Sequence, residues 1–315
     1  MTKNQEKVSV IVVHYGSPRL LWNFLASVEH HPDKRLVEEV IVVNNELALD
    51  KENRVKLEKK RHSIKIVDNP QKGYASGVNR GALAAKGDIL VIANNDIEWQ
   101  PEPLVKPLID YFRRDSRIGI IGPQLIYPNG SWQRSYGRFP SLKEAIVSLL
   151  MLDSMWNMIN IITFRLNFSI KKPKFVDYVD GAFMVIKRSC FDEVGGFDES
   201  YTFYGEDVDF CWRAWKRGWK VAFNPNVRII HLRGASSTAL ALQDYAIRLF
   251  LAKKRFVQVN FGEEQAKWYV RLMHVAALER YVLYSLVAKL TNSVLWHRRA
   301  LRARALYKAF ADEID

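Results

Sequence analysis

The first 125 residues alternate short apolar runs with segments of helical length, and this alternation constrains the fold more than any other feature. The apolar runs are rich in Val and Ile and occupy residues 8–13, 39–44, 64–68, 88–96 and 118–123. Continuous runs of this kind are typical of parallel strands that are buried on both faces. The segments between them are long enough for helical crossovers and occupy residues 18–29, 50–61, 75–85 and 101–114. We therefore predict an α/β fold with a Rossmann-like, mostly parallel sheet.

After residue 125 the pattern becomes mixed. Pro128, Asn129 and Gly130 indicate a hairpin turn. A helix is expected over residues 206–217, and further strands are expected over residues 175–179, 183–187, 220–223 and 227–231. We expect the chain to consist of one domain over residues 1–237, with halves 1–125 and 126–237, and a basic helical extension over residues 238–315.

Residues 145–164 form the most apolar stretch of the chain. A carboxylate in the middle of a membrane span costs about 2.5–3.5 kcal/mol, so Asp153 argues against a transmembrane helix. In a helix the polar residues of this region share one stripe, which consists of Asp153, Asn157, Asn160, Thr163 and Asn167. We therefore predict an amphipathic helix, whose apolar side either packs on the protein's own core or faces a membrane or an acceptor.

The chain carries 47 Lys and Arg residues against 34 Asp and Glu residues, a net charge of +13. Such an excess favours partners with negative charge. Between Lys253 and Lys308, 12 Lys and Arg residues outnumber three Glu residues and are interleaved with Trp and Tyr, a pattern that suits an anionic membrane surface. No zinc-finger spacing or aromatic RNA-binding strand accompanies this charge, so we expect no nucleic-acid partner.

The two cysteines, Cys190 and Cys211, do not lie in a metal-binding or disulfide-rich spacing, which favours a reducing compartment. Residues 1–16 lack the apolar core and small-residue cleavage site of a secretory signal. Together with the basic C-terminal region, this predicts a cytoplasmic protein that is peripheral at the inner face of the cell membrane.

Polar residues follow several predicted strands, and open parallel sheets bind ligands beyond the carboxyl ends of their strands. These residues are His14, Tyr15, Asn44, Asn69, Asn94, Asn95 and Asp96. Oxygen ligands suit Mg²⁺ or Mn²⁺, and such an ion neutralises a diphosphate leaving group. Asp96 is the candidate for the direct ligand, unless it only caps the next helix. Residues 69–81 contain three glycines and lead into a predicted helix, so a phosphate could approach their amides, although the spacing matches no P-loop.

A second acidic cluster, Glu206, Asp207 and Asp209, falls in the first turn of a predicted helix. The helix dipole stabilises carboxylates there, but three of them exceed what capping requires, and they repel one another. At least one should therefore act as a base toward an acceptor hydroxyl or support a metal ligand. His231 ends a predicted strand and either has a structural role or binds a metal ion together with Asp96.

Seven segments, in this order, resemble those of the inverting family 2 glycosyltransferases, and most closely their bacterial rhamnosyltransferase-like members. They are VSVIVVHYG, EVIVVNN, DNPQKGYASGVNRG, GDILVIANND, GIIGPQLIYPNGSWQRS, VDGAFMVIKRSCFDEVGGFDESYTFYGEDVDFCWRAWKRGWKV and NVRIIHLRGASS. The resemblance covers residues 8–237. It implies a GT-A fold, a nucleotide-sugar donor, a divalent metal ion and a single displacement at the anomeric carbon. Residues 1–125 would bind the donor, and residues 126–237 would supply the acceptor contacts and the catalytic groups.

By position, the resemblance implies that Asp207 is the catalytic base and Glu206 its acidic neighbour. It places Asp96 on the metal ion and His231 beside the metal ion or the diphosphate. Residues implied to lie along the nucleotide or the donor sugar are Gly73, Asn79, Arg80, Gly81, Asn94, Asn95 and Gly181. Asn44 stands where the family usually has Asp, but its side-chain oxygen can still accept a hydrogen bond from a pyrimidine N3–H.

The expected reaction is transfer of a sugar, in the first instance L-rhamnose from dTDP-rhamnose, to a polyprenyl-linked or growing surface polysaccharide. A related alternative is a transferase that uses UDP-galactose, UDP-glucose or UDP-N-acetylglucosamine. A different alternative is a non-catalytic saccharide-binding protein on the same fold. Asn44 and Asn94 favour this last alternative, whereas the presence of both Asp96 and Asp207 opposes it.

Overall fold

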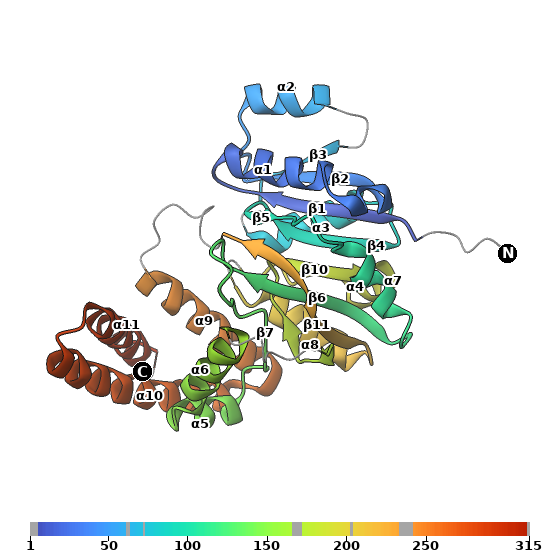
Figure 1. Cartoon of the computed structure of the whole chain (residues 1–315). Helices are drawn as coiled ribbons and strands as arrows, with labels where there is room; N and C mark the ends of the chain where they lie inside the picture. Colours follow the sequence, from blue (N-terminus) through green and yellow to red (C-terminus); the bar gives the residue numbers. More distant parts are fainter. Residues whose placement is uncertain are drawn as a thin grey trace. The chain divides into compact units, whose positions relative to one another are not determined.

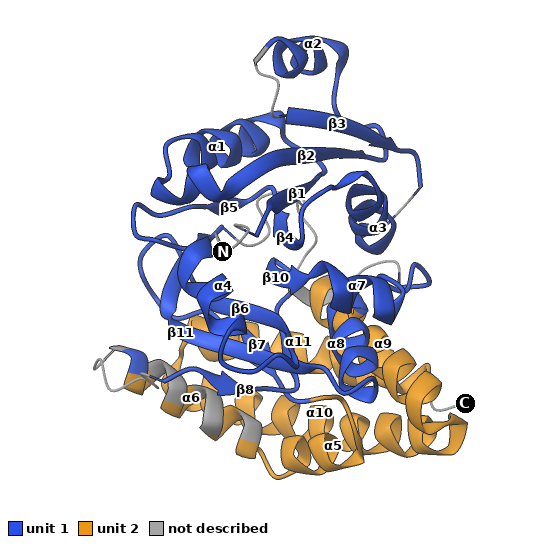
Figure 2. Cartoon of the chain, turned by 90° about the vertical axis from the view of Figure 1, so that its right-hand side faces the viewer, with its two compact units in different colours: residues 1–138, 164–202, 206–238 blue, residues 139–163, 203–205, 239–315 orange. Residues whose placement is uncertain are grey.

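The computed structural model of the chain describes residues 6–60, 64–71, 73–165, 172–201, 204–232 and 242–313. The chain divides into two compact units, which Figure 2 distinguishes by colour. Unit 1 consists of residues 1–138, 164–202 and 206–238. Unit 2 consists of residues 139–163, 203–205 and 239–315.

Unit 1 is built on a twisted sheet (Figure 1). Its strands are β1 (Val8–His14), β2 (Val37–Asn45), β3 (Ile64–Asn69), β4 (Ile89–Asn94), β5 (Ile97–Glu98), β6 (Ile118–Ile126), β8 (Lys174–Phe175), β10 (Phe183–Lys187) and β11 (Lys220–His231). The strand order in the described residues is β3-β2-β1-β4-β10-β6-β11-β5, and β8 pairs with β11. Strands β1 to β4 are parallel, whereas β10 runs antiparallel between β4 and β6. The predicted mostly parallel α/β sheet is therefore confirmed, and each of the five apolar runs forms a strand.

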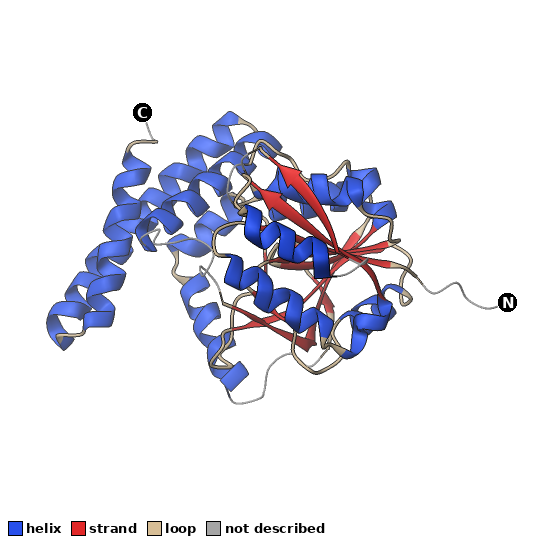
Figure 3. Ribbon diagram, turned by 90° about the horizontal axis from the view of Figure 1, so that it is seen from above, coloured by secondary structure: helices blue, strands red, loops and turns tan. Residues whose placement is uncertain are grey.

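Helices cover both faces of this sheet (Figure 3). They are α1 (Pro18–Glu29), α2 (Lys51–Lys60), α3 (Tyr74–Ala84), α4 (Val105–Phe112), α7 (Arg188–Val194) and α8 (Glu206–Lys216), with a short 3₁₀ helix over Pro32–Leu36. Alternate residues of β1 point to opposite faces. Val10 and Val12 lie in one hydrophobic cluster with α1 and α4, whereas Ile11 lies beneath Gly81 of α3. The crossover helices predicted from the first 125 residues are thereby confirmed.

Two strand predictions in the second half need correction. The strand predicted over 175–179 is two short strands, because β8 pairs with β11 while β9 (Tyr178–Val179) pairs with β7 (Tyr136–Gly137) in a separate sheet. Conversely, the two strands predicted over 220–223 and 227–231 are the single strand β11. Pro225 has no N–H for the ladder, and the register with β6 shifts between Asn224 and Arg228.

The helix predicted over residues 145–164 is also two elements, α5 (Leu142–Leu149) and α6 (Leu152–Arg165). Met151 adopts a left-handed conformation with φ of 54°, which ends the first helix. Apolar residues of α6, including Met155 and Ile162, are exposed. The side chains of Asp153, Asn157, Asn160 and Asn167 lie outside the described part of the chain, so the polar stripe stays a prediction.

Unit 2 contains α5, residues 152–163 of α6, and the helices α9 (Leu242–Phe261), α10 (Glu263–Thr291) and α11 (Val294–Ala311). Glu144 of α5 accepts hydrogen bonds from Lys253 Nζ at 2.7 Å and from the Tyr269 hydroxyl at 3.0 Å. These contacts hold α5 against α9 and α10. The predicted helical C-terminal region is therefore confirmed. Throughout the described ranges, every helix is too short or too polar to cross a membrane.

Gly81 provides a test of how α3 packs on the sheet. A Cβ atom at Gly81 would lie 2.4 Å from Cγ2 of Ile11 and 2.9 Å from Cγ2 of Val43, so a side chain here would push the helix off β1 and β2. Alanine favours a helix by about 1 kcal/mol over glycine, but overpacking of a core costs about 1–3 kcal/mol. We expect Gly81→Ala to lower the free energy of unfolding, measured by urea denaturation. Leu83→Ala, at an 85% exposed position of the same helix, should change it little. Equal stability of the two variants would contradict this packing.

Candidate active site

The metal-ligand candidates Asp96 and His231 lie side by side in unit 1. Asp96 occupies the turn between β4 and β5, and β5 pairs with the end of β11 so that Ile97 stands opposite His231. This pairing leaves His231 Nε2 3.5 Å from Asp96 Oδ1. Both side chains are buried. The sheet therefore brings together two residues that are 135 positions apart in the sequence.

Gln133 determines which nitrogen of His231 faces Asp96. The Gln133 amide donates from Nε2 to the backbone oxygen of His231 at 3.2 Å, so its Oε1, 2.6 Å from His231 Nδ1, must accept. Nδ1 therefore carries the proton, and the lone pair of Nε2 is left on the Asp96 side. The sequence analysis did not single out Gln133. Its only signal was its position in the GSWQRS part of the family-like segment.

The Asp96 and His231 pair fits a divalent cation. Asp96 Oδ1 is buried and has no hydrogen-bond partner in the described part of the chain. Without an ion, the lone pairs of Asp96 Oδ1 and His231 Nε2 would face each other at 3.5 Å and repel each other. Two atoms that bind the same metal ion, each about 2.0–2.2 Å from it, lie at such a separation. No cluster of three His, Cys, Asp or Glu residues suited to a metal ion occurs among the described residues. Water or substrate oxygens would complete the coordination, as is usual for Mg²⁺.

The base candidate Asp207 is held by two backbone amides. Gly181 N–H donates to Asp207 Oδ2 at 2.8 Å, and Val208 N–H donates to Oδ1 at 2.8 Å. Burial, reinforced by Asp180, raises the pKa of Asp207 to about 6 despite these two hydrogen bonds. Burial and then the charge of Asp207 raise the pKa of Glu206 to about 8. The two neighbouring carboxyl groups therefore both hold their protons more tightly than exposed carboxyl groups do.

The hydroxyl of Tyr74 lies among the carboxylates of the site. It donates to the backbone oxygen of Gly181 at 3.0 Å. Burial raises the pKa of Tyr74 well above its usual value, and four carboxylates add to the shift, those of Glu206, Asp207, Asp180 and Asp96. The turn at Gly181 also contacts β4, because Asn94 N–H donates to Ala182 O at 3.0 Å. Asp96 and Asp207 therefore both lie close enough to Tyr74 to act on its pKa, and the sequence analysis singled out neither Tyr74 nor Asp180.

Gly181 leaves little room between its backbone and the base. A Cβ atom at this position would lie 3.0 Å from Cβ and 3.3 Å from Oδ2 of Asp207. Any larger residue would therefore displace the carboxylate. The sequence analysis did not anticipate this contact between Gly181 and Asp207, and the contact of Gly181 with a donor sugar stays a prediction.

His14, Tyr15 and Asn95 form a cluster at the carboxyl end of β1. Asn95 Nδ2 donates to His14 Nδ1 at 3.1 Å and to the backbone oxygen of Tyr15 at 3.0 Å. His14 Nδ1 therefore accepts, and the proton of the neutral ring lies on Nε2, a buried atom without a partner in the described residues. Burial lowers the pKa of His14 to about 4. Tyr15 is exposed, and Asn94 is half-buried at the end of β4.

The asparagines at the ends of β2 and β3 are already hydrogen-bonded within the protein. Asn44 Oδ1 accepts from Leu49 N–H at 2.7 Å, and Asn44 Nδ2 donates to Asp68 at 2.8 Å. The predicted contact of Asn44 Oδ1 with a pyrimidine base stays a prediction. That contact would use the second lone pair of Asn44 Oδ1, because Leu49 N–H already occupies the first. Asn69 Nδ2 donates to Asn45 at 2.7 Å and to Ser76 at 2.9 Å, which ties β3 to β2 and to α3.

The residues of α3 have mainly structural contacts. Asn79 exchanges two hydrogen bonds with the backbone of Phe197, each 2.8 Å long, and so fixes the segment after α7. Arg80 is exposed, and Gly81 lies against β1 and β2. Gly73 begins the helix with a φ of 103°, a conformation that favours glycine, directly before Tyr74. In the described ranges, neither Asn79 nor Arg80 hydrogen-bonds to Asp96 or Asp207.

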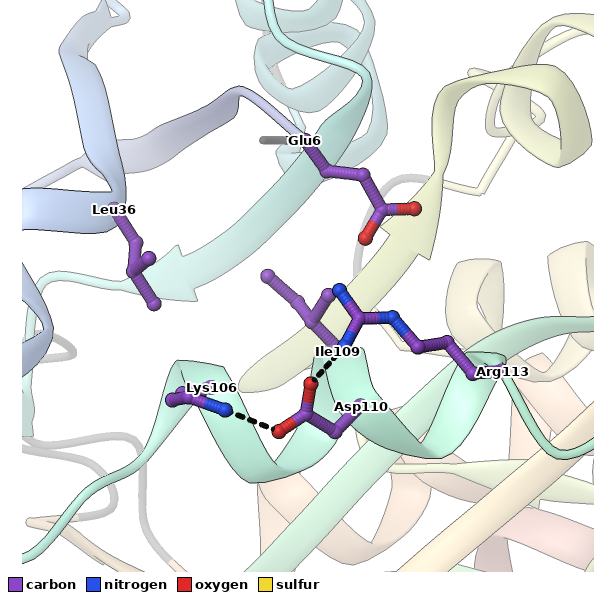
Figure 4. Close-up of a pocket in the computed structure, with 6 residues that line it drawn as sticks. All are labelled: Glu6, Leu36, Lys106, Ile109, Asp110 and Arg113. Carbon is purple, nitrogen blue, oxygen red and sulfur yellow. Dashed lines mark hydrogen bonds and ion pairs between the residues drawn. The ribbon is translucent and has the colours of Figure 1, made fainter. Parts of the chain in front are cut away.

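A separate hollow of about 130 Å³ lies at the opposite end of the strands (Figure 4). It is lined by Glu6, Leu36, Lys106, Ile109, Asp110 and Arg113. Glu6 lies two residues before β1, and Leu36 directly precedes β2. Asp110 is paired with Lys106 at 2.5 Å and with Arg113 at 2.8 Å. The hollow therefore lies at the amino ends of β1 and β2 and contains none of the predicted site residues.

The protonation of His14 can be measured directly. Because its ring is buried, we expect it to stay neutral from pH 7 down to about pH 4, with its proton on Nε2. Nuclear magnetic resonance of histidine-labelled protein reports both properties, and His14→Gln identifies the signal. A pKa near the usual 6.5, or a proton on Nδ1, would contradict the arrangement of His14 and Asn95.

This chain is similar in sequence or in structure to three known glycosyltransferases. An N-acetylglucosaminyl-diphospho-decaprenol L-rhamnosyltransferase from Mycobacterium tuberculosis is 29% identical to this chain over 202 residues. The match covers 58% of this chain and 64% of the relative, so this chain spans less than two thirds of the relative's length. A mannosyltransferase from Pyrobaculum calidifontis, solved with GDP-Man and Mn²⁺, matches with a TM-score of 0.63 and 15% identity over 99% of this chain and 88% of that chain. GalNAc-T7, solved with UDP, GalNAc and Mn²⁺, matches with a TM-score of 0.55 and 18% identity over 81% of this chain and 50% of that chain.

The structural matches show the GT-A fold that the resemblance implied. A model of glycosyl transferase family group 2 matches residues 107–306. The model of glycosyl transferase family 2 matches residues 9–195, which is more than half of the chain. The chain therefore belongs to glycosyl transferase family 2.

Proposed function

We propose that this protein transfers a sugar from a nucleotide-sugar donor to a hydroxyl of a saccharide acceptor, with inversion at the anomeric carbon. The observation that carries the proposal is that the carboxylate of Asp207, held by the amides of Gly181 and Val208, and the buried pair of Asp96 and His231 both lie near Tyr74. A general base and a site for a charged leaving group are the two parts that such a displacement needs.

The preferred donor is dTDP-L-rhamnose and the preferred acceptor a polyprenyl-linked saccharide. The mycobacterial relative, which by its name is an L-rhamnosyltransferase acting on a decaprenol-linked sugar, supports both choices at 29% identity. A UDP-linked hexose is the alternative donor, and the structural neighbour GalNAc-T7, solved with UDP and GalNAc, supports it. Nucleotide release from dTDP-rhamnose, UDP-galactose, UDP-glucose and UDP-N-acetylglucosamine, measured in parallel, distinguishes the donors. Binding of a donor without any turnover would favour a non-catalytic saccharide-binding protein.

In the proposed reaction, Asp207 accepts the proton of the acceptor hydroxyl. The hydroxyl oxygen then forms a bond to the anomeric carbon, and the bond from that carbon to the diphosphate breaks, so that the electron pair leaves with the diphosphate. A pKa of about 6 suits this role, because the carboxylate is ionised at neutral pH and still basic enough to take a proton. The amides of Gly181 and Val208 keep its oxygens in place.

Asp96 and His231 would hold the divalent ion, and Gln133 keeps the Nε2 lone pair of His231 available for it. When bound, the ion would neutralise charge on the departing diphosphate. The raised pKa of Glu206 reduces the negative charge that it adds beside Asp207.

Replacing the base tests its role. We expect Asp207→Asn to lower kcat by at least about a hundredfold while donor affinity is nearly retained, because the substitution keeps the size of the side chain and removes its basicity. In the wild type, kcat/KM should fall as the pH drops below about 6, since Asp207 then becomes protonated. Asp192→Asn, at an exposed position on α7, is the matched control and should retain activity. Near-normal turnover of Asp207→Asn would refute the assignment.

The metal assignment is tested by calorimetry in the presence of Mn²⁺. We expect Asp96→Ala to weaken nucleotide-sugar binding by about tenfold or more, because the ion would lose its carboxylate ligand. EDTA should weaken binding to the wild type to a similar degree and have no further effect on the variant. Asp88→Ala removes an exposed carboxylate at the amino end of the same strand and serves as the control. A wild type that binds donor equally well in EDTA would disprove the metal role of Asp96 and His231.

A further inference from the structure

The side chain of Tyr74 reaches from α3 to the turn that precedes β10. Its hydroxyl donates to the backbone oxygen of Gly181 at 3.0 Å, across 107 positions of the sequence. Tyr74 is the first residue of α3, and burial raises the pKa of its hydroxyl well above the usual value. The hydroxyl is therefore protonated at neutral pH and acts as a hydrogen-bond donor.

Gly181 accepts this hydrogen bond with its carbonyl and holds the base candidate with its amide. The Gly181 N–H donates to Oδ2 of Asp207 at 2.8 Å, and a Cβ atom at Gly181 would lie 3.0 Å from Cβ of Asp207. Only the two soft dihedral angles of Gly181 separate its N–H from its carbonyl. A shift of the carbonyl therefore moves the N–H that holds Asp207.

Helix α3 gives Tyr74 a firm support, because a glycine lets the helix lie directly on the sheet. A Cβ atom at Gly77 would lie 2.9 Å from Cγ1 of Val13 in β1. The first turn of the helix is also tied to the end of β3, since Asn69 Nδ2 donates to Ser76 Oγ at 2.9 Å. The position of Tyr74 is therefore fixed relative to the carboxyl ends of β1 and β3.

The turn has further supports on either side of Gly181. Asp180 N–H donates to Ser135 O at 3.0 Å, and Asn94 N–H donates to Ala182 O at 3.0 Å. These bonds hold the neighbouring peptide groups. Loss of the bond from the tyrosine hydroxyl should therefore leave the turn folded and release mainly the carbonyl of Gly181.

We propose that Tyr74 is a positioning residue for the base, which holds the carboxylate of Asp207 through Gly181 without touching the reacting groups. The effect on catalysis rests on the proposed function, whereas the hydrogen-bonded chain from Tyr74 to Asp207 does not. Misplacing a catalytic group by about 1 Å lowers a rate by up to about a hundredfold, so a hydroxyl outside the reaction affects turnover. Helix α3 thereby sets the position of the base.

The Gly181 amide reports the contact with the base without any substrate. Asp180 and Gly181 form the one Asp–Gly pair in the sequence, so ¹³C in Asp carbonyls and ¹⁵N in Gly isolate this amide in a nuclear magnetic resonance spectrum. In the wild type, its signal should shift with pH as Asp207 titrates, with a midpoint at about pH 6. Asp207→Asn should abolish the shift. We expect Tyr74→Phe to raise the midpoint by at least about 0.5 pH units, because a weaker hydrogen bond from Gly181 stabilises the carboxylate less.

The midpoint reports this hydrogen bond and not a change of charge. Titratable groups face Asp207 from its own helix, Glu206 and Cys211, from the turn, Asp180, and from α3, Tyr74. Tyr74→Phe leaves the first three in place. It removes no charge at neutral pH, because the tyrosine hydroxyl is protonated there.

Turnover is the second measurement. Tyr74→Phe should lower kcat about tenfold, because the base is held less well. The affinity for Mn²⁺ with a nucleoside diphosphate, measured by calorimetry, should stay unchanged, since Asp96 and His231 keep their contacts. Tyr111→Phe, on α4 against the hydrophobic core, is the matched control and should change neither kcat nor the midpoint. Thermal unfolding checks that both variants fold.

An unchanged midpoint in folded Tyr74→Phe would overturn the proposal, and so would a raised midpoint with unchanged kcat. A wild-type Gly181 amide that does not follow the titration of Asp207 would overturn it without any variant. If the wild type transfers no sugar while Tyr74→Phe still raises the midpoint, the proposed transfer reaction is wrong and the positioning of Asp207 by Tyr74 stands.

Discussion

The site depends on backbone pairing that returns late segments of the chain to the carboxyl end of β4. Asn94 N–H donates to Ala182 O at 3.0 Å, which brings the turn at Gly181 beside this strand end. A few residues further on, Leu232 N–H donates to Asp96 O at 3.0 Å, and Ile97 pairs with His231. Without the first contact the base loses its position, and without the second Asp96 loses His231. Strand β10, antiparallel among parallel neighbours, makes the first contact possible.

Burial shifts the pKa values of ionisable groups in the candidate active site and also lowers the stability of the fold there. The same low-dielectric surroundings raise the pKa of Asp207 and Glu206 and lower that of His14. Asp96 Oδ1, His14 Nε2 and Glu206 Oε2 are buried without hydrogen-bond partners in the described part of the chain. Unsatisfied buried polar atoms cost about 1–3 kcal/mol each, so a ligand that satisfies them would bind more tightly for that reason. Buried ionisable groups with shifted pKa values are expected at a functional site.

Periodicity predicted the first half of the fold well because β1, β2 and β4 are buried on both faces, which leaves continuous Val and Ile runs in the sequence. The candidate acids could be singled out from the sequence because strand ends and the first turn of α8 are locations that the pattern itself reveals. Gln133 and Tyr74 were missed because they act through tertiary hydrogen bonds, to His231 and to Gly181, and such bonds have no periodic signal. The single helix over 145–164 was wrong because hydropathy does not reveal the left-handed conformation at Met151.

The central claim is that Asp96 and His231 bind the metal ion that accompanies the donor. Pulsed electron paramagnetic resonance of the protein with Mn²⁺ and a nucleoside diphosphate tests it most directly, because a nitrogen ligand couples to the unpaired electrons of the ion. The account predicts a coupling from one imidazole nitrogen, Nε2 of His231, that disappears in His231→Gln. A bound Mn²⁺ without nitrogen coupling, or with a coupling that persists in His231→Gln, would contradict the account.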